Sequence, residues 1–177
     1  MVAARKQDQG RPAPRVRRAY YDCRYGQLHL HNAIPAGGGF DELTTLICIP
    51  GSGQTGRVFA PLLLPLGQGR SVYALDLPGA GESDPAPGVD CVEAGMHAVL
   101  DFIDSMRIRR FDLLAREQGC KVALQVLEQR RDAVRRTVLC GAAGPAKSAA
   151  GVTSLTLAEA DTATFAARLV ELLAGPT

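Results

Sequence analysis

The sequence Ser71-Val-Tyr-Ala-Leu-Asp-Leu-Pro-Gly-Ala-Gly-Glu-Ser-Asp84 joins a short apolar run to an acidic, glycine-rich turn. The segment before it has the same form, because the apolar run Leu43–Ile49 leads directly into Pro50-Gly-Ser-Gly-Gln-Thr-Gly56. Continuous apolar runs of this length, bounded by glycine and proline, are typical of strands that are buried on both faces of a parallel sheet. The two segments therefore predict two strands of such a sheet.

The rest of the chain continues this alternation of strands and helices. Alternating residues on both sides of Gly26-Gln27 predict an antiparallel hairpin from Ala19 to Ile34. The remaining apolar patterns predict strands at Arg110–Leu114 and Val134–Leu139, and helices at Val58–Leu66, Val89–Met106, Gln118–Gln129 and Leu157–Leu173. Residues 145–155 are small and polar and suggest a loop. The order predicts one α/β domain over residues 19–177, with a doubly wound, mostly parallel sheet behind an N-terminal antiparallel hairpin.

The composition fits one folded domain. The chain has 177 residues, 46% of them hydrophobic and 21% charged, and its formal net charge is +2. No apolar run approaches the ~18 residues of a membrane span, so we expect no membrane partner. Residues 1–18 are rich in arginine and also hold Pro12 and Pro14, which predicts a flexible basic tail.

The cysteines and aromatic residues exclude further classes. Five cysteines lie far apart along the chain, which is typical of reduced thiols in a cytoplasmic protein. None of them has a histidine at a zinc-type spacing, so the sequence predicts no metal site. Aromatic residues make up 5% of the chain and tryptophan is absent, so nucleic acid is not an expected partner.

Two interpretations compete for the loop after Ile49. The first is a dinucleotide fingerprint, Gly51-x-Gly53-x-x-Gly56, with Asp76 at the end of the next strand. In this interpretation the glycines let the backbone approach a pyrophosphate, and the acid binds a ribose hydroxyl of NAD or NADP.

The second interpretation uses more of the chain. From about Tyr20 to Gly144 the sequence resembles the α/β-hydrolase family, in which a hairpin precedes the first parallel strand and an oxyanion loop follows it. The turn Asp76–Asp84 is the most specific segment of this resemblance. The family's nucleophile elbow corresponds to Leu114-Ala-Arg-Glu-Gln-Gly-Cys120, which follows the third parallel strand. We favour this interpretation because three separate segments agree in order.

The resemblance implies a site that departs from the family's usual one. Glu117 occupies the position of the nucleophile, where the family has serine, cysteine or aspartate. The backbone amides of Ser52 and Gln118 occupy the positions that donate to an oxyanion. The resemblance also implies that this chain lacks the last strands of the family's sheet, together with the loop that carries the catalytic histidine.

No histidine follows Glu117 in the sequence. His29 and His31 belong to the predicted hairpin and His97 to the helix after the Asp76 turn, and we interpret all three as surface or satisfied histidines. Other side chains that could take part in catalysis have simpler structural interpretations. Ser83 belongs to a structural turn, Cys120 to a buried helix turn, and Asp161 to the start of a helix.

The favoured hypothesis is an α/β-hydrolase-like protein that is weak or inactive as an esterase-type hydrolase. It would bind a small molecule, without a cofactor, in a pocket between Pro50–Gly56 and the elbow. One alternative is an active hydrolase of esters, epoxides or haloalkanes that uses Glu117 or a histidine of a partner chain. The other is an NAD(P)-binding module. Because Val134–Leu139 would lie at the sheet edge, we also expect the C-terminal helix or a second copy of the chain, in a homodimer, to cover it.

Overall fold

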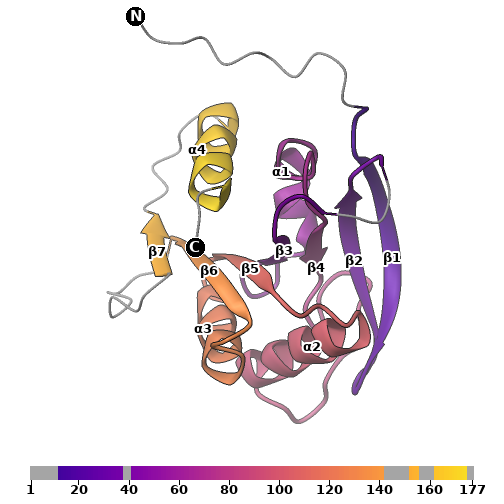
Figure 1. Cartoon of the computed structure of the whole chain (residues 1–177). Coiled ribbons are helices and arrows are strands. Elements are labelled where there is room, and N and C mark those ends of the chain that lie inside the picture. Colours follow the sequence, from indigo (N-terminus) through magenta and orange to yellow (C-terminus); the bar gives the residue numbers. More distant parts are fainter. Residues whose placement is uncertain (1–11, 38–40, 142–151, 156–161, 175–177) are drawn as a thin grey trace, which may run out of the picture.

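The computed structural model describes residues 12–37, 41–141, 152–155 and 162–174 (Figure 1). Within them, seven strands form one sheet in the order β1-β2-β4-β3-β5-β6-β7. Their bounds are β1 (Arg15–Cys23), β2 (Gly26–Ile34), β3 (Thr45–Ile49), β4 (Val72–Leu75), β5 (Phe111–Arg116), β6 (Val134–Cys140) and β7 (Val152–Leu155). β2 pairs antiparallel with both β1 and β4, and the other pairs are parallel. The predicted fold class is confirmed.

Helices cover both faces of the sheet. They are η1 (Gly56–Phe59), α1 (Ala60–Leu66), α2 (Cys91–Ser105), α3 (Gly119–Gln129) and α4 (Thr162–Ala174). Figure 1 shows α2 and α3 on one face and α1 and α4 on the other. Each face has its own core: Ile103 and Val126 pack under α2 and α3, whereas Leu63 and Leu169 pack under α1 and α4. The helix predicted at Val89–Met106 is α2, and it begins at Cys91 because the side chain of Asp90 accepts hydrogen bonds from the first amides of the helix.

The predicted end of the basic tail at residue 18 is wrong. β1 already begins at Arg15, and the backbone from Arg15 to Arg18 pairs with Ile34 to His31 of β2. The side chains of these residues are exposed, so the segment has no apolar alternation to mark it as a strand. Charged residues are common on the outer strand of a sheet, where they oppose pairing with other chains. Residues 1–11 lie outside the described part of the chain.

The prediction of a loop over residues 145–155 is wrong for Val152–Leu155, which form β7, and residues 145–151 lie outside the described part of the chain. The predicted sheet edge at Val134–Leu139 is also wrong. β7 pairs in parallel with β6, with Thr137 opposite Val152. The backbone of β6 therefore has partners on both sides. A homodimer was expected because this strand would lie at the sheet edge, and that reason no longer holds. A strand of four residues is too short to give a clear sequence pattern. The predicted start of the last helix, Leu157, lies outside the described residues.

A buried ion network fastens α4 to the sheet. The carboxylate of Asp112 accepts hydrogen bonds from Arg70 Nη1 at 3.0 Å and from Arg135 Nε at 2.9 Å. Arg70 Nη2 also donates to the carbonyl of Leu173 at 3.0 Å, near the end of α4. Cations at this end of a helix bind its free carbonyl groups and complement its dipole. Side chains from β4's preceding loop, β5 and β6 thus hold the last described helix in place.

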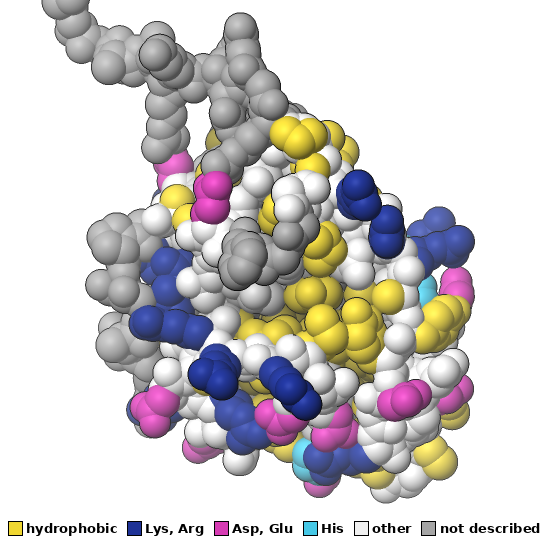
Figure 2. All heavy atoms as spheres, turned by 45° about the vertical axis from the view of Figure 1, so that its right-hand side comes forward, with side chains coloured by type: hydrophobic (Ala, Val, Ile, Leu, Met, Phe, Trp, Pro, Cys, Tyr) yellow, Lys and Arg dark blue, Asp and Glu magenta, His cyan; other side chains and the backbone are white. Residues whose placement is uncertain are grey.

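On the face shown in Figure 2, Lys and Arg side chains are intermixed with Asp and Glu side chains, and hydrophobic side chains gather in the middle. The two signs of charge are therefore not segregated on this face. None of the described helices has the length and hydropathy that a membrane span requires.

Candidate functional site

A cavity of about 290 Å³ opens at the carboxyl ends of the central parallel strands. In the sheet order β4-β3-β5, the chain leaves β3 toward β4 on one side and reaches β5 on the other. A reversal of this kind leaves a crevice at the strand ends, which is where open α/β sheets bind ligands. The cavity walls come from four segments, namely the loop after β3, the loop after β4 and the first turns of α2 and α3.

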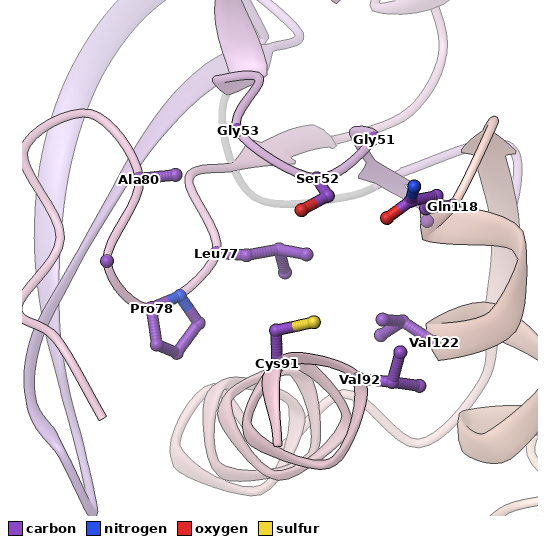
Figure 3. A pocket seen from close by; sticks show the side chains of 12 residues that line it. Gly51, Ser52, Gly53, Leu77, Pro78, Ala80, Cys91, Val92, Gln118 and Val122 are labelled. Carbon is purple, nitrogen blue, oxygen red and sulfur yellow. The ribbon is translucent and has the colours of Figure 1, made fainter. Parts of the chain in front are cut away.

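The lining combines apolar side chains with exposed backbone. Figure 3 shows the side chains of Ser52, Leu77 and Cys91 pointing toward the middle of the cavity, with Val92 and Val122 below Gln118. Small-molecule pockets generally have this composition, a mostly apolar wall with a few polar groups that fix orientation. Cys91 was not among the predicted site residues, although its position at the first turn of a helix that begins beside the Asp76 turn could have indicated it.

Two glycines of the loop after β3 lie in close contact with neighbouring segments. A Cβ atom on Gly56 would lie 2.3 Å from the backbone oxygen of Ala74, so η1 can start against β4 only with glycine at this position. A Cβ atom on Gly51 would lie 2.9 Å from Glu117 Oε2. The glycine pattern therefore brings this loop against β4 on one side and against the elbow on the other.

Asp76 is buried beneath the loop rather than open to the cavity. Its side chain is 2% exposed, and Oδ1 accepts a hydrogen bond from the Gly56 amide at 2.6 Å. Oδ2 lies 2.9 Å from Nδ1 of His29. The hydroxyl of Ser83 donates to the Asp76 carbonyl at 2.7 Å, so Ser83 has the structural role that was expected of it. The Asp76 carboxylate is fully engaged inside the protein, where a ribose hydroxyl could not reach it.

The structure places Glu117 at a sharp bend between β5 and α3. Its φ angle is 50°, in the left-handed region that side chains rarely adopt, and its amide donates to the carbonyl of Cys140 at 2.8 Å. Behind it, a Cβ atom on Gly119 would lie 2.2 Å from the backbone oxygen of Pro50. This is the geometry of a nucleophile elbow, a strained strand-to-helix turn with a small residue that allows close packing.

The carboxylate of Glu117 does not line the cavity. It is held by Gln54, whose Nε2 donates to both carboxylate oxygens, at 3.2 and 3.1 Å. The backbone of Gln54 is itself fixed within the loop, because its backbone amide donates to the carbonyl of Gly51 at 3.1 Å. The acid therefore lies on the loop side of the elbow, and its chemical role stays a prediction.

The residues that follow Gly51 and Glu117 both line the cavity. Ser52 and Gln118 contribute to its wall, and their role as oxyanion-type donors stays a prediction. Among the described residues, neither backbone amide donates a hydrogen bond to another protein group. Gln118 is the N-cap of α3, where amides are free because the helix has no preceding turn. The two amides are thus available to an oxygen atom of a ligand.

The three histidines lie away from the elbow, and none hydrogen bonds to Glu117. His97 of α2 is 2.9 Å from the hydroxyl of Tyr25 through Nδ1. His29 is 2% exposed and bonds to Asp76 through Nδ1, but its Nε2 is buried without a hydrogen-bond partner. The interpretation of His29 as a surface or satisfied histidine is therefore wrong for this atom.

The fold also assembles a group that the sequence spacing did not predict. His29, His31 and Asp76 each offer a ligand atom for a metal ion, and these atoms lie within 4.8 Å of one another. Asp76 is 47 residues from His29 along the chain, so no local motif joins them. The available signal was a His-x-His pattern on a strand, which places two imidazoles on one face.

The other candidates have structural surroundings. Cys120 is 3% exposed, and burial raises the pKa of its thiol above the ordinary value, which disfavours the thiolate. Asp161 lies outside the described residues.

Comparisons with known proteins now identify the family. The model of the alpha/beta hydrolase family matches residues 46–176. The chain belongs to this family. No match was found among the curated proteins.

Solved structures agree in fold. An epoxide hydrolase from Vigna radiata superposes with a TM-score of 0.62 at 15% identity, over 72% of this chain and 40% of the other. A putative hydrolase and naproxen esterase (carboxylesterase NP), both from Bacillus subtilis, give TM-scores of 0.62 at 18% identity over 72% of this chain. The alignments span 44% and 43% of those two proteins, so this family member corresponds to less than half of each neighbour's length.

Proposed function

We propose that this chain binds a small, neutral carbonyl compound in the cavity between the loop after β3 and the elbow. We further propose that, on its own, it hydrolyses esters and epoxides weakly or not at all. The observation that carries the proposal is the pair of free amides, Ser52 and Gln118, that flank an otherwise largely apolar cavity.

The free amides supply the polar half of the proposed recognition. A carbonyl oxygen that accepts from both amides would satisfy two donors that the protein leaves unpaired. Leu77, Val92 and Val122 would pack against the apolar part of the same ligand. A cavity of about 290 Å³ limits this ligand to a small compound.

The charge of Glu117 favours a neutral ligand over an anion. Its carboxylate lies against Gly51, one residue before Ser52, and Gln54 keeps it there. A ligand carboxylate bound to the same amides would meet this negative charge at short range. An amide, ester or ketone offers an accepting oxygen without that repulsion.

The arrangement of Glu117 also supports low hydrolytic activity. A nucleophile has to approach the carbon whose oxygen the amides hold, whereas this carboxylate is bonded to Gln54 outside the cavity wall. A histidine that would activate water must lie within hydrogen-bond reach of it, and the three histidines are bonded or buried elsewhere.

Hydrolysis through Glu117 is the second candidate. It is favoured by the position of the acid on a strained elbow and by neighbours that are described as epoxide hydrolases. It requires the Glu117 side chain to leave Gln54 and turn toward the cavity. The dinucleotide hypothesis has less support, because the carboxylate of Asp76 is occupied by Gly56 and His29.

The binding proposal is tested with three six-carbon probes that differ only in the polar group: hexanamide, hexanoate and hexanol. We expect hexanamide to raise the melting temperature most, because a ligand at 100 times its Kd adds about 2.7 kcal/mol, which is about 5–10 °C for a chain of this size. Hexanoate should gain affinity in the Glu117→Gln variant. Equal shifts for all three probes would contradict recognition of a carbonyl oxygen.

A matched pair of variants places the binding site. Ala80 lines the cavity and Ala86 lies farther along the same loop, outside the cavity lining, and both are partly buried. Ala80→Phe should fill the cavity and abolish the shift with hexanamide, while Ala86→Phe should retain it. Retained binding in Ala80→Phe would place the ligand elsewhere and refute the proposed site.

A further inference from the structure

A polar cluster lies on the antiparallel side of the sheet, away from the cavity lining. His29 and His31 are two residues apart on β2, so their side chains project from the same face of the strand. β4 pairs with β2 and ends one residue before Asp76, whose amide donates to the carbonyl of His29 at 2.9 Å. The strand pairing therefore brings the three side chains together.

The tautomer of His29 follows from its bond to Asp76. Asp76 accepts a hydrogen bond from Gly56 on its other oxygen, as a carboxylate does, and so Nδ1 of His29 carries the proton that faces Oδ2. The lone pair is then on Nε2. This atom is buried in a side chain that is 2% exposed, and no group of the described residues bonds to it. A buried acceptor without a partner destabilises the folded chain, and a bound ion would remove this cost.

We propose that His29 and His31 bind one divalent transition-metal ion, such as Zn²⁺, while Asp76 holds the ring of His29 in place. A carboxylate behind a ligating imidazole is the usual arrangement at zinc sites, because it fixes the tautomer and makes the ring a better ligand. The ring of His31 packs against that of His29, with centroids 5.0 Å apart and planes at 86°. One ligand atom of each of the three residues lies within 4.8 Å of the other two, so the two imidazoles lie close to each other and to Asp76.

The position of His31 supports this site, because it lies two residues from His29 on β2 and its ring packs against the ring of His29. His31 is only partly buried, and it can therefore turn by the small amount that Zn–N bonds of about 2.0–2.1 Å require. Water would complete the coordination from the exposed side.

The charges around the cluster are mixed. Asp76 and Glu82 are negative, and the Glu82 carboxylate accepts a hydrogen bond from Tyr20, whose ring lies 5.0 Å from that of His29. Arg18 Nη1 lies 3.7 Å from Glu82 Oε1. The positive charge of Arg57 also interacts electrostatically with His31. Because positive and negative groups both face the rings, binding has to come from the imidazole lone pairs and not from net charge. This favours a transition metal over Ca²⁺ or Mg²⁺, which prefer oxygen ligands.

The test is a titration of the EDTA-treated full chain with Zn²⁺, followed by calorimetry, and with Co²⁺, followed by its visible absorption. The chain has three histidines, so His97→Gln serves as the matched control for His31→Gln. We expect one ion per chain, unchanged affinity in His97→Gln, and at least a 100-fold loss in His31→Gln, since even the loss of an outer partner costs 10–100-fold. Affinity in His31→Gln equal to that of the parent would overturn the proposal.

Two further variants separate other causes. Cys91→Ser removes an exposed thiol that could bind Zn²⁺ by itself, and it should leave the affinity unchanged. His29→Gln should abolish binding, and because His29 is buried, the circular dichroism of this variant is compared with that of the parent. If His29→Gln unfolds, the partly buried His31 remains the decisive position. Loss of binding in Cys91→Ser with retention in His31→Gln would assign the ion to the thiol and refute the site.

Discussion

Asp112 offers a direct measure of how strongly the buried ion network stabilises the fold. Its carboxylate is 0% exposed and forms ion pairs with Arg70 and Arg135, whose side chains are 2% and 8% exposed. Burial lowers the pKa of Arg70, the expected sign for a cation taken out of water. Asp112→Ala leaves two buried guanidinium groups without their anion, and breaking such a group costs about 3–5 kcal/mol.

This loss is measurable by urea denaturation. With a slope of about 2 kcal/mol per molar urea, the midpoint of Asp112→Ala should fall by about 2 M. The matched control is Asp104→Ala, which removes an exposed ion pair with Arg130. In this pair the side chain of Asp104 is 61% exposed and that of Arg130 is 38% exposed. This substitution should cost no more than about 1 kcal/mol. A loss in Asp112→Ala as small as that in Asp104→Ala would refute the reasoning, and hydrogen exchange should show α4 to be the first helix to open.

Three further predictions concern single positions. Arg107 has a φ angle of 53° just after α2, so Arg107→Gly should raise the free energy of unfolding by up to about 1 kcal/mol in urea denaturation, and a clear loss would contradict the strain. Gly119→Ala should destabilise by several times more than an exposed substitution such as Gln125→Ala, because the added carbon meets the backbone of Pro50; equal melting temperatures would contradict this packing. His31 has a lowered pKa in the folded chain, so the folded state binds fewer protons than the unfolded one. The free energy of unfolding should therefore fall as the pH drops below about 6.5. In EDTA, His31→Gln should flatten this pH dependence, and an unchanged slope would contradict the role of His31.

The fold could be predicted from sequence where local patterns and burial agree. The run that ends at Ile49 consists of apolar and β-branched residues because β3 lies in the middle of the sheet, with helices on both faces. Asp90 marks the start of α2 because its side chain binds free amides of the first turn, a purely local interaction. The first four residues of β1 and the whole of β7 were not predicted, because three of those four residues are arginines and β7 has only four residues.

Only the backbone arrangement of the candidate site could be predicted from the sequence. Gly119 and Glu117 have a fixed spacing around a strand-to-helix turn, and a turn of this kind is visible in sequence. The orientation of the Glu117 carboxylate could not be predicted, because it depends on Gln54, which lies 63 residues away along the chain. The meeting of His29 with Asp76 similarly depends on the pairing of β2 with β4.

The most direct test of the central claim compares the parent chain with Glu117→Gln in the hydrolysis of 4-nitrophenyl butyrate and of styrene oxide. Because the carboxylate is bonded to Gln54 outside the cavity wall and no histidine reaches it, both chains should give the same low rate, and Glu117→Ser should add no ester hydrolysis of the kind that a serine–histidine pair provides. A parent rate about tenfold or more above that of Glu117→Gln would mean that Glu117 lowers the barrier by about 1.4 kcal/mol or more, and it would contradict a chain that binds without hydrolysing.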